Sequence, residues 1–253
     1  MNKKPNILVT NDDGISSPGI KSLIEVTGKY GNLTVIAPDK PMSGVGHAIT
    51  MRKPIIIEAV THYNGISSWK CSGTPVDCVK FGLANILKEK PQLVVSGINH
   101  GSNSSISIIY SGTMGAAIEG SLHGVPSIGF SLCDYNPDAD FSRAKIFVAK
   151  IFQSVIENGL TPFTCLNVNI PKEKPKGIKV CRQTHGKWVE EFDKRTDPHN
   201  REYFWLSGYF KNFEENHDET DEQALENHFV SIVPVTVDMT CYKTLELLKN
   251  WKF

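Results

Sequence analysis

The chain has 253 residues, of which 40% are hydrophobic and 21% are charged. This composition is typical of globular proteins and excludes a disordered, collagen-like or disulfide-scaffold chain. The formal net charge is +0, which removes the usual electrostatic argument for binding a nucleic-acid polymer or a membrane. No apolar run approaches the ~20 residues that span a bilayer, and the six cysteines form no C-x-x-C pair. We therefore expect a cytoplasmic protein with reduced thiols.

The first two thirds of the chain alternate short apolar runs with amphipathic stretches, which is the pattern of βαβ units around a mostly parallel sheet. Residues 6–10 (NILVT) predict a strand covered on both faces. Ser17-Pro18 predicts a helix start, and Thr74 begins a second helix with a capping box. The other predicted elements are strands at 33–37, 93–95, 126–132 and 165–170 and helices at 76–87, 113–123 and 141–157.

After about residue 175 the pattern changes to longer strands. Residues 187–205 predict a long hairpin that turns at Asp197-Pro198-His199-Asn200 and projects from the core. The other predicted elements are strands at 178–183 and 229–233, a solvated acidic loop at 212–222 and a closing amphipathic helix through Leu248. We expect a Rossmann-like core over residues 1–175 and a hairpin and oligomerisation region over residues 176–253.

Asn11-Asp12-Asp13-Gly14 stands directly after the first predicted strand. Because loops beyond the carboxyl ends of parallel strands form the ligand crevice, this loop presents two adjacent carboxylates to a ligand. A divalent cation is the readiest way to stabilise two such charges, and oxygen ligands favour Mg²⁺, Mn²⁺ or Ca²⁺. Taken alone, the motif also fits an Asx turn that caps a helix.

Two more strand ends carry oxygen ligands. Ser43-Gly44 follows the strand at 33–37, and Ser96-Gly97-Ile98-Asn99 follows the strand at 93–95. Serine and asparagine supply neutral oxygens, which complete a carboxylate-anchored metal site without excess charge. We expect these loops and the Asp12-Asp13 loop to converge at one edge of the sheet.

Ser111-Gly112-Thr113 precedes the predicted helix of small residues. Free backbone N–H groups and the positive end of the helix dipole favour a phosphate there. The alternative is ordinary N-capping by Ser111 or Thr113.

Two histidines, His47 and His100, lie in the predicted site loops and are candidate proton carriers or phosphate donors. The sequence predicts no functional cluster around the other histidines considered, which are His123, His185, His199, His217 and His228.

Together these motifs resemble the SurE family, the stationary-phase survival proteins that act as metal-dependent 5'/3'-nucleotidases. The motifs that carry the resemblance are Asn11-Asp12-Asp13-Gly14, Ala37-Pro38-Asp39, Ser43-Gly44, Ser96-Gly97-Ile98-Asn99, Gly101, Asn103, Tyr110-Ser111-Gly112-Thr113, Thr196-Asp197-Pro198 and Thr220-Asp221. They span nearly the whole chain in the family's order. The chain departs from the pattern at His228, where glycine is expected.

The resemblance implies a metal site and a substrate site in these loops. One divalent cation per subunit, Mg²⁺ or Mn²⁺, is expected on Asp12, Asp13, Ser43 and Asn99, and catalysis is expected to use Asp12, Asp13 and Asn99. The residues expected to bind substrate or phosphate are Asn11, Gly44, Gly97, Asn103, Ser111, Gly112 and Thr113.

The resemblance also implies an activity and an assembly. The activity is hydrolysis of nucleoside 5'-monophosphates, with 3'-monophosphates and polyphosphate as further substrates. The assembly is a homodimer or homotetramer in which the C-terminal hairpin and helix exchange between subunits. The aromatic residues Tyr203, Phe204 and Trp205 on the predicted hairpin favour a subunit contact independently.

Three other functions share features with this pattern. A receiver domain needs an aspartate at the end of the central strand, where this chain has Ser96-Gly97-Ile98-Asn99. A haloacid-dehalogenase-like phosphatase needs Asp-x-Asp, whereas the chain has Asn11-Asp12-Asp13. A non-catalytic nucleotide sensor on the same fold stays open, because fold does not fix function.

Overall fold

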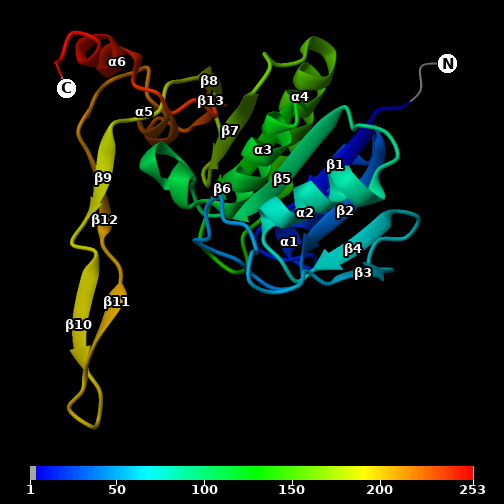
Figure 1. Cartoon of the computed structure of the whole chain (residues 1–253), viewed down its shortest axis with the longest axis horizontal. Coiled ribbons are helices and arrows are strands. Elements are labelled where there is room, and N and C mark those ends of the chain that lie inside the picture. The colour runs from blue at the N-terminus through cyan, green and yellow to red at the C-terminus, as the bar shows by residue number, and fades with distance from the viewer. Residues whose placement is uncertain (1–3, 253) are drawn as a thin grey trace.

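The computed structural model describes residues 4–252 and is built around a nine-stranded sheet in the order β3-β4-β2-β1-β5-β6-β7-β13-β8 (Figure 1). Its strands are β1 (Asn6–Thr10), β2 (Asn32–Pro38), β3 (Ile57–Val60), β4 (Ser67–Cys71), β5 (Leu93–His100), β6 (Ser127–Cys133), β7 (Thr164–Pro171), β8 (Gly177–Val180) and β13 (Phe229–Thr236). Only the β3–β4 and β7–β13 pairs within this sheet are antiparallel. The predicted α/β architecture with a mostly parallel sheet is therefore confirmed.

Helices cover both faces of the sheet. Helices α1 (Pro18–Thr27) and α4 (Ser142–Asn158) pack together on one face, and α2 (Pro75–Phe81) and α3 (Gly112–Leu122) pack together on the other. The sequence of strand β1 is almost wholly apolar because successive side chains point to opposite faces of the sheet, and helices cover both faces. Ile7 and Val9 enter one hydrophobic core, while Leu8 enters the other, and all three are fully buried.

Local capping signals place two of these helices where the sequence predicts them. The Ser17 hydroxyl accepts from the N–H of Ile20 at the start of α1. Thr74 and Asp77 form a complete capping box at the start of α2, and the helical path continues as a π-helical turn over Gly82–Ile86. Strands β3 and β4 and the 3-10 helix η2 (Ser105–Tyr110) were not predicted.

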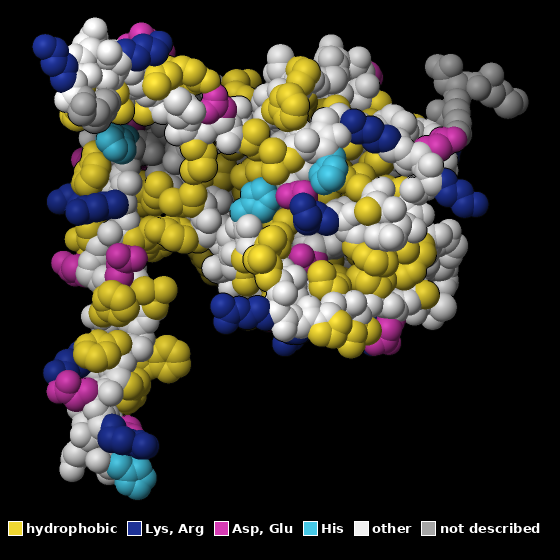
Figure 2. All heavy atoms as spheres, in the orientation of Figure 1, with side chains coloured by type: hydrophobic (Ala, Val, Ile, Leu, Met, Phe, Trp, Pro, Cys, Tyr) yellow, Lys and Arg dark blue, Asp and Glu magenta, His cyan; other side chains and the backbone are white. Residues whose placement is uncertain are grey.

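The segment 186–212, hereafter the arm, leaves the core as two narrow antiparallel pairs. Strand β9 (Gly186–Val189) pairs with β12 (Tyr209–Asn212), and β10 (Phe192–Thr196) pairs with β11 (Glu202–Leu206). Figure 1 shows the arm extending far from the sheet, and Figure 2 shows hydrophobic side chains along it. The predicted projecting hairpin is confirmed and is longer than the sequence indicated.

The chain returns from the arm through α5 (Asp221–Glu226) into β13 and ends in α6 (Tyr242–Leu248). The prediction of a solvated loop over residues 212–222 is wrong at its end, because Thr220 and Asp221 are fully buried. His228 has a φ of 63°, in the left-handed region that favours glycine, which is the residue type expected there. Within residues 4–252, no helix is long and apolar enough to cross a membrane.

Candidate active site

The predicted loops meet at the carboxyl ends of β1, β2 and β5. From β1 the chain proceeds to β2 on one side, while β5, β6 and β7 extend the sheet on the other side. This reversal is the topological switch point, where open α/β sheets bind ligands. Thr10 at the end of β1 lies opposite Ser96 of β5. The Asp12-Asp13 loop and the Asn99 segment therefore leave the sheet side by side.

Asp12 lies almost wholly buried at the centre of this edge. Its Oδ1 accepts a 2.5 Å hydrogen bond from the Thr113 hydroxyl of α3. Its backbone carbonyl accepts from the N–H of Met42 at 2.7 Å, next to Ser43. One aspartate thus joins the β1 loop, the Ser43 loop and the start of α3.

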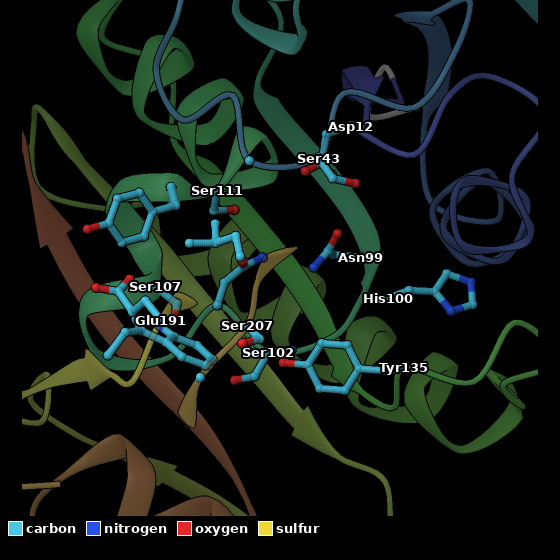
Figure 3. Close-up of a pocket in the computed structure, with 16 residues that line it drawn as sticks. Asp12, Ser43, Asn99, His100, Ser102, Ser107, Ser111, Tyr135, Glu191 and Ser207 are labelled. Atoms are coloured by element: carbon cyan, nitrogen blue, oxygen red, sulfur yellow. Dashed lines mark hydrogen bonds between the residues drawn. The ribbon is translucent and has the colours of Figure 1, made fainter. Parts of the chain in front are cut away.

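Asp13 and Asn99 are connected in the same way through β5. The Oδ2 of Asp13 accepts from the backbone N–H of His100, the neighbour of Asn99, at 3.4 Å. The amide nitrogen of Asn99 donates to the carbonyl of Gly101 at 2.9 Å, which orients its side chain. Figure 3 shows the Asn99 side chain directed toward Asp12 and Ser43.

These residues open into a cavity of about 540 Å³, within the range of roughly 300–1,000 Å³ that is usual for small-molecule sites. The predicted site residues that line it are Asp12, Ser43, Gly44, Asn99, Asn103 and Ser111. The exposed loop of Ser43 is held over the cavity by the N–H of Gly46, which donates to the carbonyl of Tyr110 at 3.0 Å. Segments that are distant in sequence therefore share one pocket, whereas the predicted site residues Asn11, Asp13, Gly97, Gly112 and Thr113 are not among those that line it.

The start of α3 closes the site beneath Asp12. The Ser111 hydroxyl caps the helix by accepting from the N–H of Met114 at 3.0 Å. Gly112 approaches Asp12 so closely that a Cβ there would lie 2.8 Å from the Cβ of Asp12. A larger residue at position 112 would therefore displace the carboxylate.

Three residues expected to contact substrate have protein partners in the structure. The amide nitrogen of Asn11 donates to the carbonyl of Gly14 and to the Ser17 hydroxyl, which fixes the turn into α1. The amide nitrogen of Asn103 donates to the Ser131 hydroxyl at 2.8 Å. Gly97 lies in β5 with a φ of 125°, against the carbonyl of Phe130.

The electrostatics of the aspartate pair suit a divalent cation. Burial raises the pKa of Asp12 from 3.8 to about 6, and the charge of Asp13 adds to this shift. Burial also raises the pKa of Asp13. Both ionised carboxylates are thus poorly stabilised by the protein alone. Together with Ser43 and Asn99 they would make an all-oxygen donor set of the kind that Mg²⁺ and Mn²⁺ prefer. No group of three or more His, Cys, Asp or Glu side chains within residues 4–252 is arranged to hold a metal, and this donor set needs only two carboxylates.

The structure separates the two candidate histidines. His100 lines the cavity, and its ring packs edge-on against Phe141. His47 instead lies 3.0 Å from the buried carboxylate of Glu119, outside the lining of the cavity. Glu119 also accepts from Lys80 at 2.9 Å and lies 3.1 Å from His123. His123 is therefore a hydrogen-bonded histidine outside the lining of the cavity.

The opposite wall of the cavity consists of residues that the sequence does not predict to lie at the site. It is lined by Tyr135, Trp188, Glu191, Leu206, Ser207 and Gly208. Five of these residues belong to the arm, namely Trp188, Glu191, Leu206, Ser207 and Gly208, so the arm forms part of the pocket. No motif marks them, because what brings them to the site is the path of the arm.

Comparisons with known proteins agree with this geometry. The family model described as "Survival protein SurE" matches residues 7–190. A protein of Cytophaga hutchinsonii named "5'-nucleotidase SurE" is 54% identical over 99% of this chain and 98% of its own, and one of the same name from Bacteroides thetaiotaomicron is 48% identical over 98% and 96%. The crystal structure of a SurE protein from Aquifex aeolicus aligns with a TM-score of 0.84 at 37% identity, covering 97% of this chain and 98% of that one.

Proposed function

The chain belongs to the SurE family, and we propose that it is a metal-dependent phosphomonoesterase that hydrolyses nucleoside 5'-monophosphates to nucleoside and phosphate. The observation that carries this proposal is the meeting of Asp12, Ser43 and Asn99 in one cavity, with Asp13 beside them. Relatives named "5'-nucleotidase SurE" that match nearly the full chain support the substrate class.

In the proposed mechanism, Asp12 and Asp13 would hold one Mg²⁺ or Mn²⁺, and the oxygens of Ser43 and Asn99 would complete its protein ligands. Such an ion would supply the positive charge that stabilises the transition state of phosphate-ester hydrolysis. Thr113 fixes the direction of the Asp12 carboxylate through its 2.5 Å hydrogen bond. The positive end of the dipole of α3, which begins at Gly112 beside Asp12, would favour the phosphate on this side of the cavity.

Phosphate release from AMP tests this function. We expect release in the presence of Mn²⁺ or Mg²⁺ and none with excess EDTA, with activity returning when metal is restored. The same assay with 3'-AMP and polyphosphate tests whether these are further substrates. Activity that persists in EDTA would contradict the metal-dependent mechanism, and a protein that binds AMP without releasing phosphate would be a sensor.

We also propose that the arm joins subunits into a homodimer or homotetramer. Phe192, Phe204, Trp205 and Leu206 on the arm are each more than half exposed. The terminal helix α6 likewise has no buried residue. Such apolar surface is unusual on a monomer and marks a contact with a partner. Light scattering should give a mass of two or four chains, and a mass of one chain would refute the assembly.

A further inference from the structure

The mechanism proposed above does not use the far wall of the cavity. This wall combines Tyr135 of the core with Trp188 and Glu191 of the arm. Figure 3 shows Asp12 and Ser43 together in one part of the pocket and Tyr135 and Glu191 away from them. We call the part at Asp12 and Ser43 the cation end of the cavity, and the part at Tyr135 and Trp188 its aromatic end.

Trp188 is held in a fixed position at the aromatic end. Its indole N–H donates to the Ser107 hydroxyl at 3.3 Å, and its ring meets Phe210 edge-on with 6.4 Å between the ring centroids. The hydrogen bond joins the arm to the 3-10 helix that precedes Ser111. The ring is nevertheless only half-buried, so part of it faces the cavity.

Tyr135 is also held in place while its ring stays open. Its hydroxyl accepts from the backbone N–H of Ser102 at 3.3 Å. Its ring lies over Gly101, where a Cβ would come within 2.3 Å of it, so only glycine permits this contact. Yet 71% of Tyr135 is exposed. The fold therefore orders an aromatic ring without burying it.

The charge of the lining fixes which end takes the phosphate. Glu191 contributes a carboxylate to the arm wall, and within residues 4–252 no lysine or arginine lines the cavity. A phosphate dianion is repelled from Glu191 and is best accommodated at the cation end. The remainder of the substrate then extends toward Tyr135 and Trp188.

We propose that Trp188 and Tyr135 form a nucleoside subsite, in which the base of the substrate packs against an ordered aromatic ring. The subsite rests on the proposed nucleotidase function and adds the part that distinguishes a nucleotide from any other phosphate monoester. Stacking on an aromatic ring tolerates every base, because each has a π-face. The subsite therefore accepts purine and pyrimidine nucleotides alike.

Adenosine binding tests the subsite apart from catalysis, because adenosine carries no phosphate. We expect isothermal titration to show binding to the wild-type protein and a dissociation constant about tenfold higher for Trp188→Ala, the effect of losing one stacked base. Tyr135→Ala should weaken binding as well, from the core side. In hydrolysis assays with metal, both variants should raise KM for AMP while keeping the wild-type rate on glycerol 2-phosphate, a phosphate monoester that carries no aromatic ring.

Phe163→Ala is the matched control, since Phe163 is an exposed aromatic residue outside the arm and does not line the cavity. It should bind adenosine like the wild type. Adenosine that binds equally well to the wild type, Trp188→Ala and Tyr135→Ala, or that fails to bind the wild type, would overturn the subsite. Adenosine binding that is weakened in these variants of a protein that releases no phosphate from AMP would support the subsite and overturn only the nucleotidase function.

Discussion

The carboxyl edge of the sheet and the arm both contribute to one cavity, but they are held in place by different means. Strands β1 and β5 are buried on both faces, so the hydrophobic core around these strands fixes the positions of Asp12 and Asn99. The arm is a narrow ribbon whose side chains are largely exposed. At its base it is fixed by a small set of buried polar contacts. The chemistry thus depends on the core, while the fit to the substrate depends on a few hydrogen bonds.

The centre of those contacts is Asp221, which is fully buried. Its carboxylate accepts from the N–H and hydroxyl of Thr184, just before the arm, at 2.9 and 2.6 Å. It also accepts from the N–H of Ser105, at the start of the helix that leads to Ser111, at 2.8 Å. One side chain therefore ties the arm to the active-site edge.

The largest effect is expected at the core edge. Asp12→Asn should lower kcat/KM for AMP by about 10³-fold or more, because the ion's stabilisation of the transition state is worth several kcal/mol. The fold should persist, since asparagine removes a buried negative charge beside Asp13. Phosphate release and thermal melting without metal measure the two properties. Asp138→Asn, an exposed aspartate outside the cavity, is the control, and near-normal activity of Asp12→Asn would refute the site.

A smaller effect on activity should follow from loosening the same carboxylate. Thr113→Val removes the hydroxyl that donates to Asp12, and loss of a group that orients a metal ligand costs about 10- to 100-fold in metal affinity or activity. Metal titrations of AMP hydrolysis measure the loss. Thr113→Ser keeps the hydroxyl and should retain most of the activity. If both variants behave alike, the hydrogen bond does not position Asp12.

Breaking the base of the arm should change substrate fit and stability more than chemistry. Asp221→Asn places an amide nitrogen among N–H donors, and each buried group left without a partner costs about 1–3 kcal/mol. We expect faster hydrogen exchange over residues 184–212 and a higher KM for AMP, with the rate on glycerol 2-phosphate retained. Asp218→Asn, an exposed aspartate nearby, is the control. Unchanged exchange would show that the arm is held by other contacts.

The smallest effect concerns the anchoring of the Ser43 loop by Glu119. Burial alone would raise the pKa of Glu119, but hydrogen bonds from His47 and Lys80 outweigh it and lower the pKa to about 2. A carboxyl whose folded pKa lies below its ordinary 4.5 stabilises the fold above pH 4.5, and this stability is lost as the pH falls from 4.5 toward 2. Glu119→Gln should therefore melt a few degrees lower at pH 6, and the difference should shrink below pH 4.5. A constant difference across that range would contradict this role.

Local signals explain which elements could be predicted from the sequence. Strand β1 and the helix starts at Ser17 and Thr74 depend on neighbours within four residues, so the pattern of the chain reveals them. The cluster on Glu119 and the burial of Asp221 depend on partners at distant positions in the chain. Their residue types are ordinary for a surface, and only the folded path shows that they are enclosed. The arm wall of the cavity escapes prediction for the same reason.

The path of the arm has an evolutionary consequence. The chain leaves the sheet at β8 and re-enters at β13, and these two strands are hydrogen-bonded neighbours. At the base of the arm, the N–H of Phe213 donates to the carbonyl of His185 at 2.9 Å, so the two ends of the excursion already touch. Insertions or deletions between them leave the register of the sheet unchanged. Evolution can therefore change the length or the side chains of the arm, and with them the pocket wall, while the residues at the carboxyl edge of the sheet stay unchanged.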